Sequence, residues 1–240
     1  QGLSASAFAS GKPADLALAQ AALNRARALE PADARLGAEV RLRAGTASAT
    51  VDRDLVDSSV ILARKAANPA QVGKVAERQL HWLRAVDYLE DHRVAQVIHY
   101  AREIVIEPRT QEELSESIPS EGDSTEILRA RVHRAEGGIA FAEEQDSDPS
   151  RPRIRWPNLH RGDVVEVAIK TYTDGPVGRK GDPPFYFMDY AGAVETRPLL
   201  YNEVIVRSPV GHQIAIDVLH GAAERTEDKI VDGRRIIRMV

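Results

Sequence analysis

The chain has 240 residues, of which 43% are hydrophobic and 28% charged, and its formal net charge is −4. The length allows one large or two ordinary domains. The negative net charge argues against nucleic acid as the main partner, because phosphate binding depends on clustered cations, and no apolar run approaches the ~20 residues that a membrane-spanning helix needs. The absence of cysteine excludes disulfides, thiolate metal sites and cysteine nucleophiles.

The N-terminus carries no recognisable targeting signal. The chain starts at Gln1 rather than Met, and the basic start, apolar run and small-residue cleavage site of a signal peptide do not follow. We therefore expect the chain to be a piece of a longer protein.

Helical spacing of apolar residues dominates residues 1–90. Four helices are predicted, and the last of them has the most regular stripe. Their apolar positions are, in chain order, Leu16, Ala19, Leu23 and Ala26; Leu36 and Val40; Leu55, Val56, Val60 and Leu62, ending at Asn68-Pro69; and Val72, Val75, Leu80, Leu83, Val86 and Leu89.

One of these segments resembles part of a helical repeat. Residues 21–31, which end at Pro31, resemble the closing helix of a tetratricopeptide repeat, and residues 62–69 are a fainter echo that ends at Pro69. The two prolines lie 38 residues apart, against ~34 for such repeats, and the aromatic signature positions are missing. Residues 1–90 are therefore predicted to form a degenerate, tetratricopeptide-like helical region.

The period of the pattern changes to two after about residue 91, which indicates β-strands. In residues 164–170, Val165, Val167 and Ile169 alternate with polar or small residues, so this strand is predicted to have one face in a core and the other in water. The predicted strands span residues 94–107, 127–134, 139–143, 164–172, 204–207 and 214–218, with hairpin turns at Glu136-Gly137-Gly138 and Asp232-Gly233 and a short helix near Gln111–Ser115. Many short strands with Pro and Gly corners favour an antiparallel β-sandwich over residues 91–240. The predicted fold class is thus α+β: an N-terminal α-helical, repeat-like region followed by an antiparallel β-sandwich.

Residues from about 90 to 240 resemble the bacterial domain family DUF3857. The matching pieces, in order, are the strand with Tyr100 and Ile106, the strand with Ala130 and Val132, the Gly137-Gly138 turn, the corner from Pro157 to Glu166, the aromatic cluster Phe185-Tyr186-Phe187, Pro198, and Val206 with Pro209. The resemblance implies a β-sandwich module that directly precedes a transglutaminase-like domain with a Cys-His-Asp triad. It also favours a periplasmic or cell-envelope location, by analogy alone. No catalytic residue can be carried over, because this chain has no cysteine.

The most promising ligand-binding segment is a Gly- and Pro-rich loop at residues 175–184. Arg179 and Lys180 beside glycines could cradle an anion. Phe185, Tyr186 and Tyr190, just after the loop, could form a platform for sugars or peptides, although packing at the edge of the sandwich explains them as well. These five residues are the predicted ligand-binding site.

Other motifs favour structural interpretations. Arg161-Gly162-Asp163 spells an integrin-binding tripeptide, but its place at the start of a strand favours a turn. The acidic run at residues 143–148 lacks the Gly and the final Glu of a calcium loop and is interpreted as solvated. The seven histidines show no metal-ligand spacing, and we predict neither a metal site nor a cofactor.

The leading functional hypothesis is a non-catalytic binding or scaffolding module that positions a downstream transglutaminase-like domain or its substrate. The alternative is a stand-alone carbohydrate- or peptide-binding protein that uses the face of the sandwich, with a protein or glycan as its ligand. A metal-dependent enzyme built from dispersed His and acidic residues is a third possibility.

Overall fold

The three-dimensional structure is a computed structural model of the chain. It describes residues 54–70, 75–89, 94–110, 113–118, 124–145, 153–173, 198–211, 214 and 225–240. All of these residues belong to one compact unit, Val51–Val240. The first two predicted helices and most of the predicted strand at 214–218 lie outside the described residues.

The described part of the chain is made mainly of strands. It contains a single helix, α4 (Ser58–Ala67). The strands are β1 (Glu77–Tyr88), β2 (Val94–Ile104), β3 (Ser115–Ser117), β4 (Ser124–His133), β5 (Ile139–Phe141), β6 (Glu143–Gln145), β7 (Arg153–Arg155), β8 (Val164–Thr173), β9 (Asn202–Pro209), β10 (Arg225–Val231) and β11 (Arg234–Met239).

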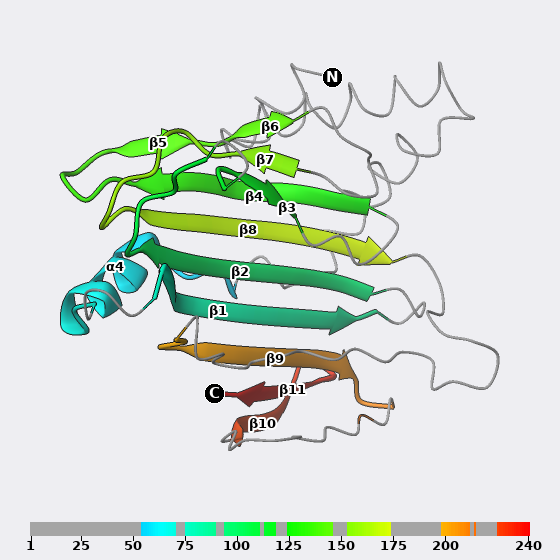
Figure 1. Ribbon diagram of the computed structural model, residues 1–240. Coiled ribbons are helices and arrows are strands. Elements are labelled where there is room, and N and C mark those ends of the chain that lie inside the picture. Colours follow the sequence, from blue (N-terminus) through cyan, green and yellow to red (C-terminus); the bar gives the residue numbers. More distant parts are fainter. Residues whose placement is uncertain are drawn as a thin grey trace, which may run out of the picture. The chain divides into compact units, whose positions relative to one another are not determined.

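Eight of the strands form one large mixed sheet (Figure 1). Their order is β10-β11-β9-β1-β2-β8-β4-β5, and the other three form a small sheet in the order β3-β7-β6. All neighbouring pairs run antiparallel except β1 and β9, which are parallel, with Val86 opposite Val206. The prediction of a purely antiparallel sandwich is therefore wrong for this pair.

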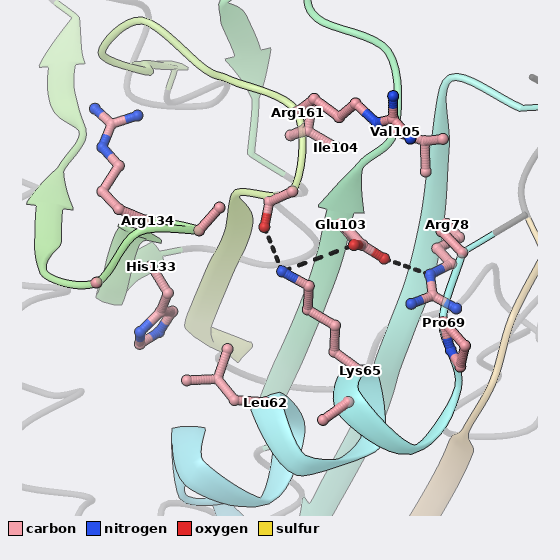
Figure 2. Close-up of a pocket in the computed structure, with 15 residues that line it drawn as sticks. Leu62, Lys65, Pro69, Arg78, Glu103, Ile104, Val105, His133, Arg134 and Arg161 are labelled. Atoms are coloured by element: carbon pink, nitrogen blue, oxygen red, sulfur yellow. Dashed lines mark hydrogen bonds and ion pairs between the residues drawn. The ribbon is translucent and has the colours of Figure 1, made fainter. Parts of the chain in front are cut away.

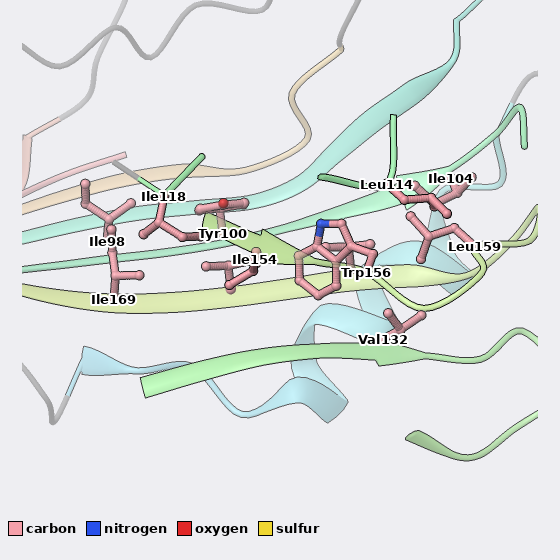
Figure 3. Close-up of a cluster of buried hydrophobic side chains, with 12 residues drawn as sticks. Ile98, Tyr100, Ile104, Leu114, Ile118, Val132, Ile154, Trp156, Leu159 and Ile169 are labelled. Carbon is pink, nitrogen blue, oxygen red and sulfur yellow. The ribbon is translucent and has the colours of Figure 1, made fainter. Parts of the chain in front are cut away.

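The main hydrophobic core lies between the large sheet and the small one. Alternate residues of β8, Val165, Val167 and Ile169, face this core, as the period-two pattern predicts. Trp156 and Ile154 cover them from the side of the small sheet and are almost fully buried (Figure 3). The small sheet is further fixed by Glu116, which accepts hydrogen bonds from Tyr100 and Arg102 of β2 and from the indole nitrogen of Trp156.

The opposite face of the large sheet is covered in part by α4. Ile61 is the fully buried residue of this helix, and it packs against Leu80, Ala101 and Val164. Asp57 caps the N-terminus by accepting a hydrogen bond from the backbone N–H of Ser59. The helix ends at Ala67 with Asn68 as its C-cap, as the Asn68-Pro69 pair predicts.

The fourth predicted helix is wrong. Residues 77–88 form β1, which pairs with β2 on one side and β9 on the other. Both faces of this central strand are buried, and its buried positions are polar as well as apolar, with Arg78, Gln79, His81, Arg84 and Asp87 among them. Polar and apolar residues therefore do not alternate, and the spacing of Leu80, Leu83 and Val86 imitates a helix. A β-bulge between Gln79 and His81 shifts the phase further.

The predicted helical repeat is also wrong in its described part. Of the stretch that echoed a tetratricopeptide helix, residues 62–67 belong to α4, which packs on a sheet and not on a second described helix. Residues 77–88, which were also assigned to the helical region, form β1 next to β2 in the large sheet. The fold is therefore predominantly β over the described residues.

Both hairpin turns predicted from the sequence are present in the structure. Gly137 and Gly138 have φ of 101° and 92° in the hairpin between β4 and β5, and Asp232 and Gly233 have φ of 50° and 73° in the hairpin between β10 and β11. Both hairpins are confirmed, since these backbone angles favour Gly and Asp. The short helix predicted near Gln111–Ser115 is wrong in its described part, which is a turn followed by the start of β3.

Candidate functional site: a buried ionic cluster and an adjoining basic pocket

The second face of β8 is not exposed to water, contrary to the prediction. Glu166, Ala168 and Lys170 are all at most 1% exposed. Glu166 faces the side on which α4 lies, and polar side chains from three strands and from α4 converge on it. We call this set the Glu166 cluster; it consists of Ser58, His81, His99, Arg129, Arg131, His133 and Glu166.

Every acceptor position of the Glu166 carboxylate is filled. Oε1 accepts hydrogen bonds from His99 Nε2 at 3.1 Å and from Arg129 and Arg131 guanidinium nitrogens at 2.9 and 3.3 Å. Oε2 accepts from Ser58 Oγ at 2.7 Å, Arg131 Nε at 3.0 Å and His133 Nε2 at 2.6 Å. A carboxylate offers about four lone-pair sites, so nothing is left for a further donor or for a substrate proton.

The partners of the histidines set their tautomers. His99 Nδ1 accepts a hydrogen bond from the backbone N–H of Val56 at 3.3 Å, so its proton lies on Nε2, which donates to Glu166. His81 Nδ1 lies 2.7 Å from a guanidinium nitrogen of Arg64 and accepts from it. A second proton on either ring would point Nδ1–H at an existing donor, so the fold favours the neutral form of both.

Burial further favours the neutral form of His81 and His99. Burial, followed by repulsion from His99 and Arg64, lowers the pKa of His81 to about 3. Burial also lowers the pKa of His99 and outweighs the opposing hydrogen bond to Glu166. For Glu166, burial alone would raise the pKa, but the hydrogen bonds from His133, His99, Arg131 and Ser58 together hold it far below its usual value. The cluster thus holds an ionised carboxylate among charged guanidiniums and the rings of His81 and His99, for which the neutral form is favoured.

The geometry of the cluster differs from that of a nucleophilic triad. In such a triad the serine hydroxyl donates to a histidine, which acts as the base. Here Ser58 Oγ donates to Glu166 and accepts from Arg131 at 2.6 Å. Neither contact removes a proton from the hydroxyl, because Glu166 has a very low affinity for one and Arg131 is a donor.

A basic pocket opens beside the cluster, between the C-terminal half of α4 and the ends of β1, β2 and β4 (Figure 2). Its volume is about 570 Å³, within the usual range for small-ligand sites. Four cationic residues line it, namely Lys65, Arg78, Arg134 and Arg161, against one carboxylate, Glu103. Apolar walls come from Leu62, Ala66, Pro69, Ile104 and Val105.

The cations of the pocket differ in how fully they are engaged. Lys65 Nζ donates to the carbonyl oxygen of Gly162 and lies 3.7 Å from Glu103. Arg134 donates to Asp163 and to the carbonyl of Asn158, both at 2.6 Å. Arg78 Nε donates to Glu103 at 2.5 Å, whereas its Nη2 is buried and has no hydrogen-bond partner among the described residues.

The structure allows only some of the predicted site residues to be judged. Arg179, Lys180, Phe185, Tyr186 and Tyr190 all lie outside the described residues. The structural interpretation of Arg161-Gly162-Asp163 is confirmed. Asp163 is 1% exposed and accepts hydrogen bonds from the backbone N–H groups of His160 and Ala135, while Gly162 has a φ of 86°.

The sequence analysis missed the Glu166 cluster, although part of its signal is visible in the chain. Arg129, Arg131 and His133 follow one another at a spacing of two, which places them on one face of a strand. His81 was hidden because its strand was predicted to be a helix. Among the described residues, no group of three or more His, Asp or Glu side chains is arranged to hold a metal ion.

Searches against known proteins give little further guidance. A candidate protease from Parabacteroides distasonis aligns with 68% of this chain and 35% of its own, at 11% identity and a TM-score of 0.49. The M1 zinc metallopeptidase from Deinococcus radiodurans aligns with 70% of this chain and 39% of its own, at 7% identity and a TM-score of 0.35. Aminopeptidase A from Legionella pneumophila aligns with 70% and 20%, at 7% identity and 0.35.

The chain spans well under half the length of each of these structures, and at such TM-scores the likeness assigns no activity to it. No protein-family model matches the chain, and a search of curated proteins finds no match. The chain has no cysteine and hence no cysteine nucleophile. None of the described helices is long and apolar enough to span a bilayer.

Proposed function

We propose that the described β domain is a non-catalytic binding module that positions a neighbouring domain or its substrate. The observation that carries this proposal is the saturation of Glu166. A buried acid whose acceptor positions are all filled by side chains of its own domain stabilises the fold but has no capacity left for acid–base chemistry. Two of the buried histidines, His99 and His81, accept hydrogen bonds from a backbone N–H and from Arg64, which favours their neutral form and supports the same conclusion.

The proposed neighbour is a transglutaminase-like domain that follows in the same protein. This part of the proposal rests on the resemblance of residues 90–240 to DUF3857. The same resemblance favours an exported protein, which fractionation of the source cells would test. The natural reading frame beyond Val240 tests the neighbour: a Cys followed by His and Asp at transglutaminase-like spacing supports it, and an unrelated domain contradicts it.

Absence of turnover is the direct test of the non-catalytic role. We expect the purified chain to hydrolyse peptide amides and esters no faster than its Ser58→Ala variant does, because Ser58 is the hydroxyl that hydrogen-bonds to the buried acid. A rate above background that this substitution abolishes would contradict the proposal.

A further inference from the structure

We propose that the basic pocket beside α4 binds a carboxylate carried on an aliphatic body, such as the C-terminal residue of a peptide. This inference names a ligand class for the binding role proposed above and rests on it. The residues that line this pocket differ from those of the loop predicted from the sequence.

The first argument is the unused hydrogen-bonding capacity of Arg78. This residue is 6% exposed, and a buried guanidinium nitrogen without an acceptor costs free energy comparable to a lost hydrogen bond to a charged group. Nη2 has no such acceptor among the described residues, yet Arg78 lines the pocket. Because Nη2 itself is buried, a rotation of the guanidinium toward the pocket would bring it to a ligand oxygen and satisfy it.

A second arginine of the pocket, Arg161, is also available to a ligand. The exposed Arg161 has no side-chain partner within the described part of the chain, and it lines the same pocket as Arg78 (Figure 2). Lys65 also lines the pocket, but it already donates to the carbonyl oxygen of Gly162 and lies 3.7 Å from Glu103. One buried and one exposed arginine therefore remain for a ligand, and guanidinium groups match carboxylates in shape and charge.

The carboxylates in and next to the pocket limit the charge that its ligand can carry. Glu103 lies in the pocket, Asp163 neutralises Arg134, and Glu107 accepts a hydrogen bond from the backbone N–H of Arg161. These three carboxylates offset much of the positive charge of the four cations. A single negative charge is compensated by what remains, whereas a phosphate dianion would be repelled by Glu103 next to Arg78.

Apolar side chains that are still open to water also line the pocket. Leu62 of α4 is half-buried, and Ala66 and Pro69, at the end of the helix, are exposed. A small inorganic anion leaves these side chains in contact with water. An aliphatic group attached to the carboxylate buries against them and gains about 25 cal/mol for each Å² of apolar surface removed from water.

The experiment is a calorimetric titration of the 240-residue chain with three probes. These are a short peptide ending in leucine with a free carboxylate, the same peptide with a C-terminal amide, and inorganic phosphate. We expect the free acid to bind at least about tenfold more tightly than the amide, the difference that one charged hydrogen bond makes. N-acetyl-leucine as a fourth probe separates the sources: equal affinity means that the pocket recognises only the terminal residue, and weaker affinity means that it also contacts the preceding chain.

Two arginine variants assign the binding to the pocket. Arg78→Gln should weaken binding of the acid by about tenfold or more. Arg161→Gln should weaken it less, because this side chain is exposed, and it keeps the test valid if the Arg78 variant fails to fold. The matched control is Arg109→Gln, an exposed arginine outside the pocket, which should leave binding unchanged.

Equal binding of the acid and the amide would overturn the proposal, as would phosphate binding as tightly as the acid. Acid binding that is unchanged in Arg161→Gln and in a folded Arg78→Gln would also overturn it. None of these results would bear on the non-catalytic role, which fails only if the chain shows turnover that Ser58→Ala removes.

Discussion

Glu166 connects several elements of the fold through the hydrogen bonds that its carboxylate accepts. Its carboxylate joins β2, β4, β8 and the start of α4 through the side chains that donate to it. Exchange of such a network for apolar residues can be neutral, but removal of one partner leaves the others uncompensated. Whether a substitution raises or lowers the free energy of unfolding therefore depends on which charged partners it leaves behind.

Replacement of Glu166 by Gln is expected to lower the free energy of unfolding by about 3 kcal/mol, the lower end of the range for broken buried ion pairs. The lower end applies because Arg129 and Arg131 keep about a quarter of their side-chain surface exposed (26% and 24%) and can be partly hydrated. Urea denaturation measures the change. Glu136→Gln, in the exposed hairpin turn, is the control and should change stability by less than about 0.5 kcal/mol.

Because of His81 and His99, we expect the free energy of unfolding to decrease in acid. The pKa of His81 falls from 6.5 to about 3 on folding, so the folded state favours the neutral ring. Its stabilising contribution is complete above pH 6.5 and is lost as the pH falls from 6.5 towards 3, at up to about 1.4 kcal/mol per pH unit. The lowered pKa of His99 acts in the same direction. Glu166 adds its own loss only below its usual pKa of 4.5.

The measurement is urea denaturation of the wild type and His81→Gln at several pH values between 7.5 and 4.5. The variant should be less stable near neutral pH, but its stability should fall less steeply on acidification. His160→Gln is the control, because His160 is exposed (64%). Parallel pH dependence in the wild type and the His81 variant would contradict this account.

At the scale of elements, α4 was predictable and β1 was not. The helix has one apolar stripe and a clear stop at Asn68-Pro69, so local signals suffice. Residues 77–88 are covered on both faces by other parts of the fold, and that burial is a property of the tertiary structure. The hairpins at Gly137-Gly138 and Asp232-Gly233 were predictable for the opposite reason, since their positive φ values are dictated locally.

The contact of α4 with the sheet is expected to depend on Ile61. Replacement of this buried residue by Ala should cost about 2–4 kcal/mol, because it leaves a cavity above Leu80 and Ala101. Hydrogen exchange should then rise first in α4. The same change should weaken binding of the leucine-ended peptide acid, since Leu62 and Lys65 belong to this helix. Val60→Ala, on the exposed side of the helix (44%), is the control.

At the scale of the whole molecule, the parallel pairing of β1 with β9 is the feature that no local pattern could predict. The two strands lie far apart in the chain, and neither carries a turn signal that points to the other. The Glu166 cluster escaped prediction for the same reason, because its members come from α4, β1, β2, β4 and β8. Tertiary register brings them together, and sequence spacing reveals only the triplet within β4.

This connectivity predicts that the large and small sheets unfold together. The two tryptophans report on them separately: Trp82 lies on β1 and stacks on Tyr100, whereas Trp156 directly follows β7 and donates to Glu116. Because Tyr100 also donates to Glu116, the loss of one sheet removes contacts of the other. Trp156→Phe leaves Trp82 as the fluorescent probe, and Trp82→Phe leaves Trp156. In each variant, the fluorescence of the remaining tryptophan should change at the same urea concentration at which β2 and β8 lose hydrogen-exchange protection. If Trp156 fluorescence changed at a lower urea concentration than the protection of β2 and β8, the small sheet would be a separate unit that opens while the large sheet stays folded.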